Sequence, residues 1–157
     1  MKIGLISVGK LSQSFIRDGA AEYAGRLKRY VTFASTELKE VKTGGKVDPK
    51  AIRRQEGESI LARVPASAYL IALDEEGRSY RSEQLADLLG RHMLQGTGEL
   101  VFVIGGAYGL SRAVKDRADL LLSLSAMTLT HQMARLLLLE QLYRGFTILR
   151  NEPYHNR

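Results

Sequence analysis

The stretch Val101-Phe-Val-Ile-Gly105-Gly106-Ala-Tyr-Gly109-Leu110 decides the fold class of this 157-residue chain. Its four leading apolar residues predict a buried strand, and the glycine pair predicts a tight turn where that strand ends. Glycine has no side chain, so a ligand can touch the backbone there, and Gly109 can adopt a positive φ before a following helix. The stretch is therefore read either as a plain turn or as a ligand-binding loop.

Apolar runs alternate with helix-period segments on both sides of this stretch, which is the pattern of a mostly parallel sheet covered by helices. Strands are predicted at 2–8, 31–38, 68–74, 100–104 and 120–124. Helices are predicted at 14–30, 49–63, 82–94 and 111–117, and from residue 130 or 131 to at least 144. No composition break or internal repeat divides the chain, so residues 1–157 are expected to form a single α/β domain.

Local signals predict where several of these elements begin and end. Asp48 before Pro49 is a helix start, because Asp can accept from free amides and Pro suits the first helical position. Ser82 is expected to cap the third helix, and the turn at 75–77 to close the third strand. The residues of the first helix expected to face the sheet are Phe15, Ala20, Tyr23 and Leu27.

Composition excludes several classes of protein. With 45% apolar and 25% charged residues, the chain is typical of a folded globular protein. No stretch approaches the roughly 20 apolar residues of a membrane span, and the apolar start at 3–8 reads as a strand and not as a signal peptide. The absence of cysteine removes disulfides and thiolate metal sites. A cytoplasmic protein without a metal or a membrane partner is expected.

The net charge of +6 favours an acidic partner. Residues 64–111 hold 3 basic and 6 acidic side chains, so the basic excess lies outside this central segment. Such a surface attracts a phosphate backbone by Coulomb forces and counterion release. The alternative is a basic surface that serves only solubility.

Three loops are predicted to meet at the carboxyl edge of the sheet, where parallel sheets bind ligands. They follow Leu73, Ile104 and Leu124. The third loop offers the hydroxyls of Ser125 and Thr128 and the apolar side chains of Met127 and Leu129. A nucleoside-like cofactor fits this set. A dinucleotide or a nucleoside triphosphate fits less well, because the glycines do not follow the G-x-G-x-x-G spacing and no Gly-Lys-Ser/Thr follows.

The last helix and the tail carry a second group of polar residues. His131, Arg135 and Arg144 are expected on the polar side of the helix, where guanidinium groups bind phosphates. His131 can equally be a hydrogen-bonding helix-start residue, and Tyr154 and His155 can equally be a frayed tail. Leucines 136–139 and 142 cover more than one face of the helix. Part of that helix is therefore expected to meet a second copy of the chain.

Several motifs in this order resemble the ribosomal RNA large subunit methyltransferase H family. They are the start 1–10 (Met-Lys-Ile-Gly-Leu-Ile-Ser-Val-Gly-Lys), the glycine stretch 102–110, the segment 122–135, Glu140-Gln-Leu-Tyr-Arg144 and Pro153-Tyr-His155. The resemblance covers the whole chain. Two departures are Thr130, where the family usually has proline, and Asn156, which separates the Tyr-His pair from the basic residue Arg157.

The resemblance implies a SPOUT-type α/β fold with a C-terminal trefoil knot, an obligate homodimer, and S-adenosylmethionine as methyl donor. It also implies methylation of N3 of a pseudouridine in a hairpin loop of 23S rRNA on assembled ribosomes, with neither DNA nor a membrane as partner. Matched to the family's motifs, the expected cofactor-binding residues are Leu73, Gly105, Leu124, Ser125, Ala126, Met127, Thr128 and Leu129.

The catalytic candidates are His131, Arg135, Tyr154 and His155. The imide N3 must lose its proton, so a base or a positive field is needed, and Tyr154 is a candidate for stacking on the base. The alternatives are a ribosome-associated RNA-binding protein without catalysis, and a methyltransferase that acts on uridine or on tRNA.

Overall fold

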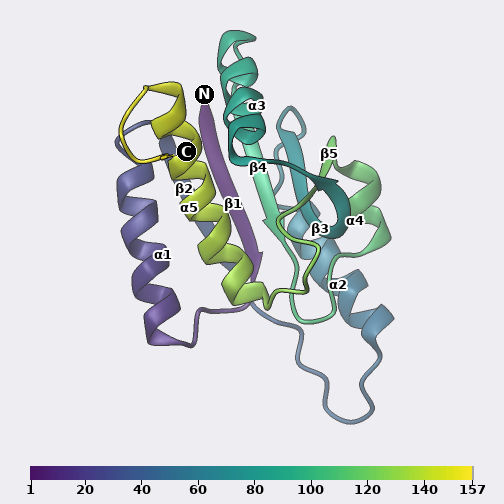
Figure 1. Cartoon of the computed structure of the whole chain (residues 1–157). Coiled ribbons are helices and arrows are strands. Elements are labelled where there is room, and N and C mark those ends of the chain that lie inside the picture. Colours follow the sequence, from purple (N-terminus) through teal and green to yellow (C-terminus); the bar gives the residue numbers. More distant parts are fainter. Residues whose placement is uncertain (157) are drawn as a thin grey trace.

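Strands and helices alternate along the whole described chain (Figure 1). The structure is a computed structural model that describes residues 1–156. In these residues the elements are β1 (Lys2–Val8), α1 (Ser14–Leu27), β2 (Thr32–Leu38), α2 (Pro49–Leu61), β3 (Tyr69–Ser79), α3 (Ser82–Leu94), β4 (Glu99–Ile104), α4 (Arg112–Arg117), β5 (Leu120–Ser123) and α5 (His131–Leu149). The predicted α/β fold class is confirmed, whereas the trefoil knot stays a prediction.

The five strands form one sheet in the order β2-β1-β4-β3-β5, and every neighbouring pair is parallel. Because all strands run the same way, all of their carboxyl ends meet at one edge of the sheet. The loops that leave this edge come from distant parts of the sequence. This topology is what allows three separate loops to build one site.

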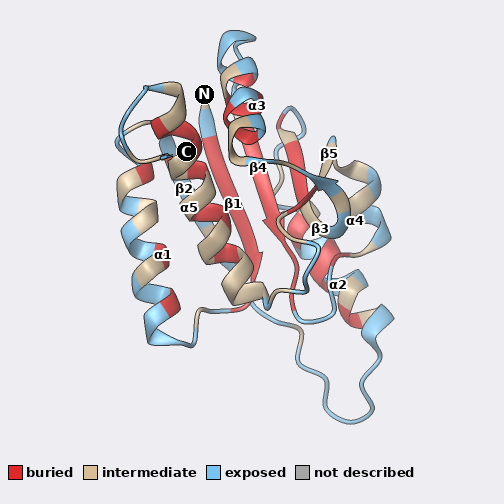
Figure 2. Ribbon diagram, viewed as in Figure 1, coloured by how far each residue is buried: buried red, intermediate tan, exposed pale blue. Residues whose placement is uncertain are grey.

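Side chains along each strand point alternately to the two faces of the sheet, and each face has its own core. Ile3 and Leu5 lie in the core covered by α1, α3 and α5, whereas Ile6 and Val8 lie in the core covered by α2 and α4. Figure 2 shows the two central strands β1 and β4 buried along most of their length between these two layers. No helix in residues 1–156 is long and apolar enough to cross a membrane.

Helix α5 lies between α1 and α3 and contacts both. Its residues Leu138, Leu142 and Phe146 are fully buried against the sheet. Gly145 permits the close approach to α3, because a Cβ atom there would lie 2.9 Å from Leu89 Cδ1. The position of α5 matters for function, since the third loop of the carboxyl edge leads directly into it.

The predicted inward face of α1 is wrong at one residue. Phe15 is 65% exposed, and the next residue, Ile16, is the buried one at 1%. Ile16, Ala20 and Leu27 follow the spacing of a single helical face, and Phe15 lies about 100° away from that face.

The predicted end of the third strand is also wrong, because β3 continues to Ser79 instead of closing at 75–77. Leu73 and Arg78 both pair with Leu122, so the intervening residues bulge out of the ladder. Gly77 allows this bulge, since a Cβ atom there would lie 2.6 Å from the carbonyl carbon of Leu121. The bulge places the acidic residues 74–76 at the carboxyl edge of the sheet.

Of the two predicted N-caps, Asp48 agrees with the structure and Ser82 does not. Asp48 Oδ1 accepts from the backbone N–H of Lys50 at 3.0 Å, as expected of an N-cap. Ser82 is not the N-cap of α3: that position belongs to Arg81, and the Ser82 hydroxyl donates to Gln141 on α5 at 2.6 Å. The hydroxyl therefore links α3 to α5 instead of capping the start of α3.

Candidate functional site

A cleft of about 780 Å³ opens at the carboxyl edge of the sheet. Its walls are the three loops selected from the sequence: the bulge after Leu73, the turn after Ile104, and the segment that follows β5. A volume of this size suits a small-molecule ligand or cofactor. A cleft therefore lies at the edge where the topology predicted a ligand crevice, and ligand binding there stays a prediction.

The glycine stretch forms both a tight turn and a wall of the cleft. The Gly109 N–H donates to Gly106 O at 3.1 Å, and Gly109 has a φ of 80°, which favours glycine. A Cβ atom on Gly105 would lie 2.8 Å from the carbonyl carbon of Gly109, so the turn could not close around a larger residue. Gly105, Gly106 and Gly109 all line the cleft.

The loop between β5 and α5 is held by its own hydroxyls. Ser123 Oγ donates to Ser125 O at 3.0 Å, and Ser125 Oγ accepts from Met127 N at 2.9 Å. Thr128 Oγ1 donates to Glu75 Oε2 at 3.4 Å, which joins this loop to the β3 bulge. The Ser125 hydroxyl expected to meet a ligand is thus bound within the loop.

The backbone of the same loop is available for a ligand. Within residues 1–156, the N–H and C=O groups of Ala126, Thr128 and Leu129 have no hydrogen-bond partner. Met127 is 78% exposed at the mouth of the cleft. Free backbone donors and acceptors next to an apolar wall are suited to a purine base.

Seven of the eight predicted cofactor-binding residues line the cleft. They are Leu73, Gly105, Leu124, Ser125, Met127, Thr128 and Leu129. Ala126 belongs to the same loop but is not part of the cleft wall. The cofactor-binding roles of all eight stay predictions.

The prediction missed several polar residues of the cleft. Asp74 follows Leu73 directly and forms an ion pair with Lys115 Nζ at 2.6 Å, while Tyr108 and Arg53 lie near its rim. The position of Asp74 immediately after a buried strand was a signal for its place at this edge. The place of Arg53 depends on the packing of α2 beside the glycine turn, which has no signal in the local sequence.

His131, at the first position of α5, also lines the cleft. The N-cap before it is Thr130, whose Oγ1 accepts from Met133 N at 3.1 Å. His131 Nε2 lies 3.8 Å from Glu40 Oε1. Thr130 therefore caps the helix where the resembling family usually has proline, and it leaves the imidazole at the cleft.

Arg135 does not lie on an open polar face, so its predicted place beside Arg144 as a phosphate-binding group is wrong. Its side chain is only 3% exposed. Nη1 donates to Glu37 Oε2 at 2.5 Å, and Nη2 donates to Gly9 O at 2.7 Å. Arg135 thus joins the first turns of α5 to the ends of β1 and β2, and its catalytic role stays a prediction.

The tail is hydrogen-bonded to the body of the protein and is not frayed. Tyr154 Oη donates to Glu140 Oε1 at 3.0 Å and lies 3.2 Å from Tyr23 Oη. Arg144 also pairs with Glu140, and its guanidinium lies over the Tyr154 ring at 4.7 Å. Arg157 lies outside the described residues.

His155 is placed between a cation and a carboxylate. Its Nδ1 lies 3.3 Å from Arg144 Nη1, and its Nε2 lies 3.3 Å from Glu83 Oε1. A guanidinium can only donate, so Nδ1 accepts and Nε2 carries the proton that is donated to Glu83. The two neighbours thus fix which ring nitrogen accepts and which donates.

The pKa values of Tyr154 and Arg144 are both raised, which keeps each of these two groups protonated. Burial, together with hydrogen bonds to Tyr23 and Glu140, raises the pKa of Tyr154. The hydrogen bond to Glu140 raises the pKa of Arg144. Tyr154 therefore remains a neutral hydrogen-bond donor at physiological pH and is not a base.

The four catalytic candidates lie in different parts of the chain's surface and interior. His131 borders the cleft, Arg135 is buried, and Tyr154 and His155 gather around Arg144. Arg144 follows His131 by 13 residues on the same helix, a rise of roughly 20 Å. One chain therefore does not bring all four to a single point.

Comparisons with known proteins agree on one family. The family model described as "Predicted SPOUT methyltransferase" matches residues 1–155. The chain is 63% identical to the ribosomal RNA large subunit methyltransferase H of Syntrophotalea carbinolica over 157 residues, which is all of both chains.

Two solved structures share the fold at low sequence identity. A probable methyltransferase from Bordetella pertussis is 15% identical and has a TM-score of 0.54, over 92% of this chain and 95% of that one. The putative methyltransferase Lpg2936 from Legionella pneumophila, solved with the bound cofactor SAM, is 13% identical and has a TM-score of 0.50, over 90% of this chain and 65% of that one.

Proposed function

The chain belongs to the SPOUT methyltransferase family, and from this premise we propose that it methylates N3 of a pseudouridine in a hairpin loop of 23S rRNA, on assembled ribosomes. It is a methyltransferase, and S-adenosylmethionine is its methyl donor. The proposed rRNA substrate is supported by the 63% identity, over the full length of both chains, to a relative named for large-subunit rRNA. We place the enzyme in the cytoplasm, as one methyltransferase domain over residues 1–157.

The cleft residues fit S-adenosylmethionine. The apolar side chains of Leu73, Leu124 and Leu129 provide a wall for the adenine, and the unpaired backbone groups of the loop before α5 can recognise its edge. The turn at Gly105 and Gly106 lets the ligand approach the backbone closely. When bound, S-adenosylmethionine supplies an electrophilic methyl group.

The substrate side requires removal of the N3 proton as the nitrogen attacks. Among the four catalytic candidates, His131 is the one that lines the cofactor cleft, so we assign it to the removal of this proton. Tyr154 stays protonated, because burial and hydrogen bonding raise its pKa, and it is assigned to donating a hydrogen bond or stacking. The cation Arg144, beside His155, can favour a developing anion.

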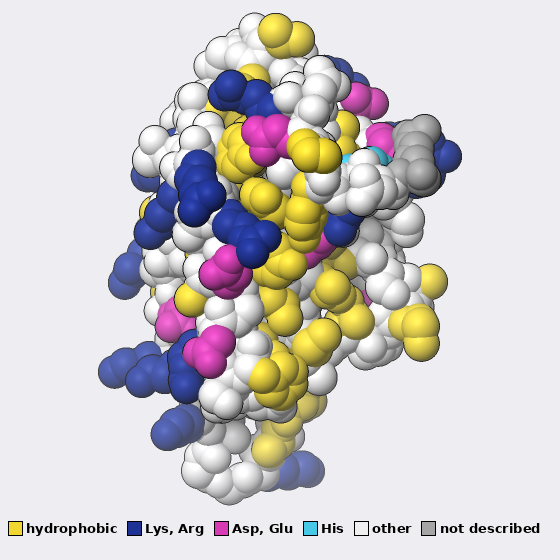
Figure 3. Space-filling view, turned by 60° about the vertical axis from the view of Figure 1, so that its left-hand side comes forward, with side chains coloured by type: hydrophobic (Ala, Val, Ile, Leu, Met, Phe, Trp, Pro, Cys, Tyr) yellow, Lys and Arg dark blue, Asp and Glu magenta, His cyan; other side chains and the backbone are white. Residues whose placement is uncertain are grey.

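A homodimer resolves the separation between these groups. The cleft lies at one end of α5 and the Tyr154–His155 group near the other, so a second chain can bring its own tail to the cleft of the first. Leu136 and Leu137 are half-buried on α5 and lie outside the core cluster. Figure 3 shows a band of hydrophobic side chains on the side where α1 and α5 lie. This band supports an interface between two copies.

The function is tested with ribosomes from a strain in which the gene has been deleted. We expect mass mapping of its 23S rRNA to show one pseudouridine that has lost a methyl group, and the purified protein with S-adenosylmethionine to restore it. His131→Ala and His155→Ala are expected to lower the single-turnover rate by about 10²- to 10⁴-fold while cofactor affinity persists. An unchanged methylation pattern in the deletion strain would contradict the proposal.

A further inference from the structure

A strongly cationic segment projects beyond the carboxyl edge of the sheet. We call residues 39–54 the basic arm; they comprise the loop after β2 and the start of α2 (Figure 1). It contains six cationic and two acidic residues, and every residue from 42 to 50 is exposed. Within residues 1–156, no carboxylate lies within 4.0 Å of any of the six cations. The cations are Lys39, Lys42, Lys46, Lys50, Arg53 and Arg54.

The arm is attached at both ends to the glycine turn of the cofactor cleft. Near its start, Val41 N donates to Glu56 Oε1 at 3.3 Å. Glu56 lies against the turn, since a Cβ atom on Gly106 would come within 2.9 Å of Glu56 Oε2. At its far end, Arg53 lines the cleft, and its Nη1 donates to Tyr108 O at 3.4 Å. The cations are therefore held beside the place where the methyl donor binds.

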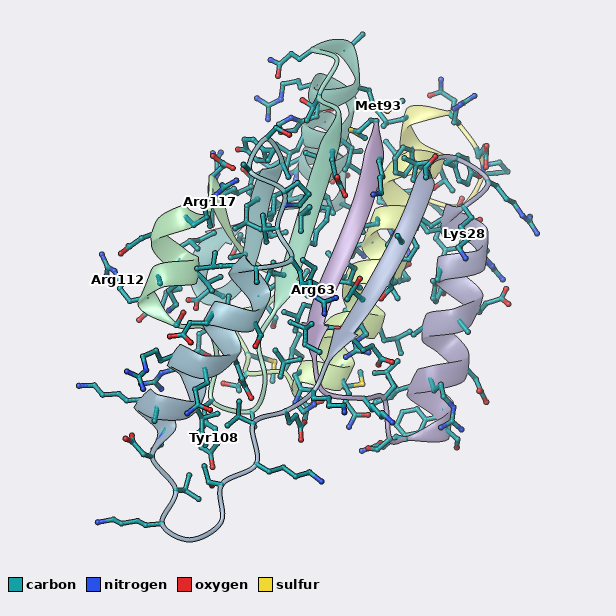
Figure 4. The ribbon with its side chains drawn as sticks, turned by 180° about the vertical axis from the view of Figure 1, so that it is seen from behind. Lys28, Arg63, Met93, Tyr108, Arg112 and Arg117 are labelled. Atoms are coloured by element: carbon teal, nitrogen blue, oxygen red, sulfur yellow. The ribbon has the colours of Figure 1, made fainter. Side chains whose placement is uncertain are left out.

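Tyr108 adds an aromatic surface at the same place. Its side chain is 42% exposed, although it lies in a turn that lines the cleft. Figure 4 shows Tyr108 near the N-terminal end of α2, on the side of the exposed loop. An exposed ring beside a row of unpaired cations is the combination that binds single-stranded nucleic acid, because bases stack on the ring and phosphates meet the cations.

We infer that the basic arm and Tyr108 form the surface on which a single-stranded segment of RNA lies while its target base enters the cofactor cleft. Lys42, Lys46 and Lys50 contact phosphates, and the Tyr108 ring stacks on a base next to the target. This inference rests on the proposed function, because it assigns the binding surface for that enzyme's RNA substrate. It also accounts for an exposed, uncompensated row of cations, which otherwise only repel one another.

Charge removal on the arm tests the phosphate contacts. The variant is Lys42→Ala/Lys46→Ala, and the matched control is Lys28→Ala/Arg63→Ala, which removes two exposed cations from the ends of α1 and α2. Figure 4 shows both control residues away from Tyr108. Binding of a fluorescent hairpin transcript of large-subunit rRNA is measured over a range of salt concentrations. For the arm variant, the slope of log K against log salt is expected to become less negative by about 1.4, and for the control to stay unchanged.

Removal of the ring tests the stacking contact. Tyr108→Ala is expected to weaken binding of the same transcript by about 5- to 150-fold, whereas Tyr108→Phe keeps the ring and the affinity. Calorimetry with S-adenosylmethionine is expected to give the wild-type affinity for the arm variant and its control, which also shows that both are folded. Because Tyr108 lines the cleft, thermal unfolding is the folding control for Tyr108→Ala.

Two results would overturn the inference. One is an arm variant whose salt slope equals that of the control; the other is a Tyr108→Ala protein that loses cofactor affinity while it keeps RNA affinity. The proposed function fails by a separate result, the unchanged methylation of rRNA in the deletion strain. If the enzyme methylates rRNA but the arm variant binds RNA like the control, the proposed function stands and the proposed RNA-binding surface is wrong.

Discussion

Glu56 is a buried carboxyl, and among the described residues only one of its two oxygens has a hydrogen-bond partner. The residue is 5% exposed; Oε1 accepts from Val41 N, whereas Oε2 has no hydrogen-bond partner among the described residues. Burial raises the pKa of Glu56, and the hydrogen bond from Val41 opposes this only in part. The charged form is therefore disfavoured beneath the glycine turn.

The raised pKa of Glu56 should make the free energy of unfolding depend on pH. Below the pKa of Glu in the unfolded chain, about 4.3, Glu56 is protonated in both states and brings no penalty. Between the two pKa values Glu56 is ionised only in the unfolded chain, so the free energy of unfolding falls as the pH rises. The fall is complete once the pH exceeds the raised folded-state pKa. We therefore expect the stability of Glu56→Gln relative to wild type to increase as the pH rises above about 4.3.

The measurement is chemical denaturation of both proteins over a series of pH values. Glu58→Gln is a matched control, because Glu58 is an exposed carboxyl on the same helix. A stability difference between wild type and Glu56→Gln that stays constant with pH would contradict this prediction.

At the scale of the element, the first turn of α5 fixes the end of the loop between β5 and α5. Thr130 caps the helix through its hydroxyl, and Arg135 one turn later is held by Glu37 and Gly9. The loop of residues 124–129 runs directly into this turn. A fixed helix start thereby fixes one end of the loop that lines the cleft.

Loss of this cap should weaken both the helix and the site. Thr130→Ala is expected to lower the free energy of unfolding by about 1 kcal/mol, because the N–H of Met133 loses its acceptor. Thr130→Ser keeps the acceptor and is expected to remain close to wild type. Urea denaturation measures the free energies, and calorimetry tests whether cofactor affinity falls with Thr130→Ala. Equal stability of the two variants would show that the hydroxyl does not cap α5.

For the whole molecule, the organisation of α5 is the main support for the proposed homodimer. Its inner face is buried in the sheet core, its flanks contact α1 and α3, and Leu137 is half-buried outside that core. The cleft and the Tyr154–His155 group lie toward opposite ends of this helix. A dimer formed through α5 would cover the apolar band and could combine the two groups.

A charge placed in this band should separate the two chains. Leu137→Lys is expected to sediment as a monomer and to lose methylation activity, because an unpaired ammonium would be buried in the interface. Leu94→Lys is the matched control, since Leu94 is 91% exposed at the end of α3. Equilibrium sedimentation gives the masses. A Leu137→Lys protein that remains dimeric would place the interface elsewhere.

The fold class and the cleft could be predicted because their signals are local. The apolar run before Gly105 marks a buried strand, and parallel strands necessarily bring their following loops to one edge. The predictions that failed depended on small differences between neighbouring residues or on contacts between residues far apart in the sequence. Phe15 and Ile16 are neighbours of similar hydrophobicity, and only the packing of α1 on the sheet selects which is buried.

The sequence by itself determined the alternation of strands and helices, the glycine turn and the three loops of the cleft, because periodicity and turn chemistry act between residues close in the chain. Only the tertiary structure decided that Arg135 is buried, since its partners Glu37 and Gly9 lie 98 and 126 residues away. It also separated His131 from Tyr154 and His155, because His131 begins α5 and the other two follow its far end, so the length of the helix lies between them.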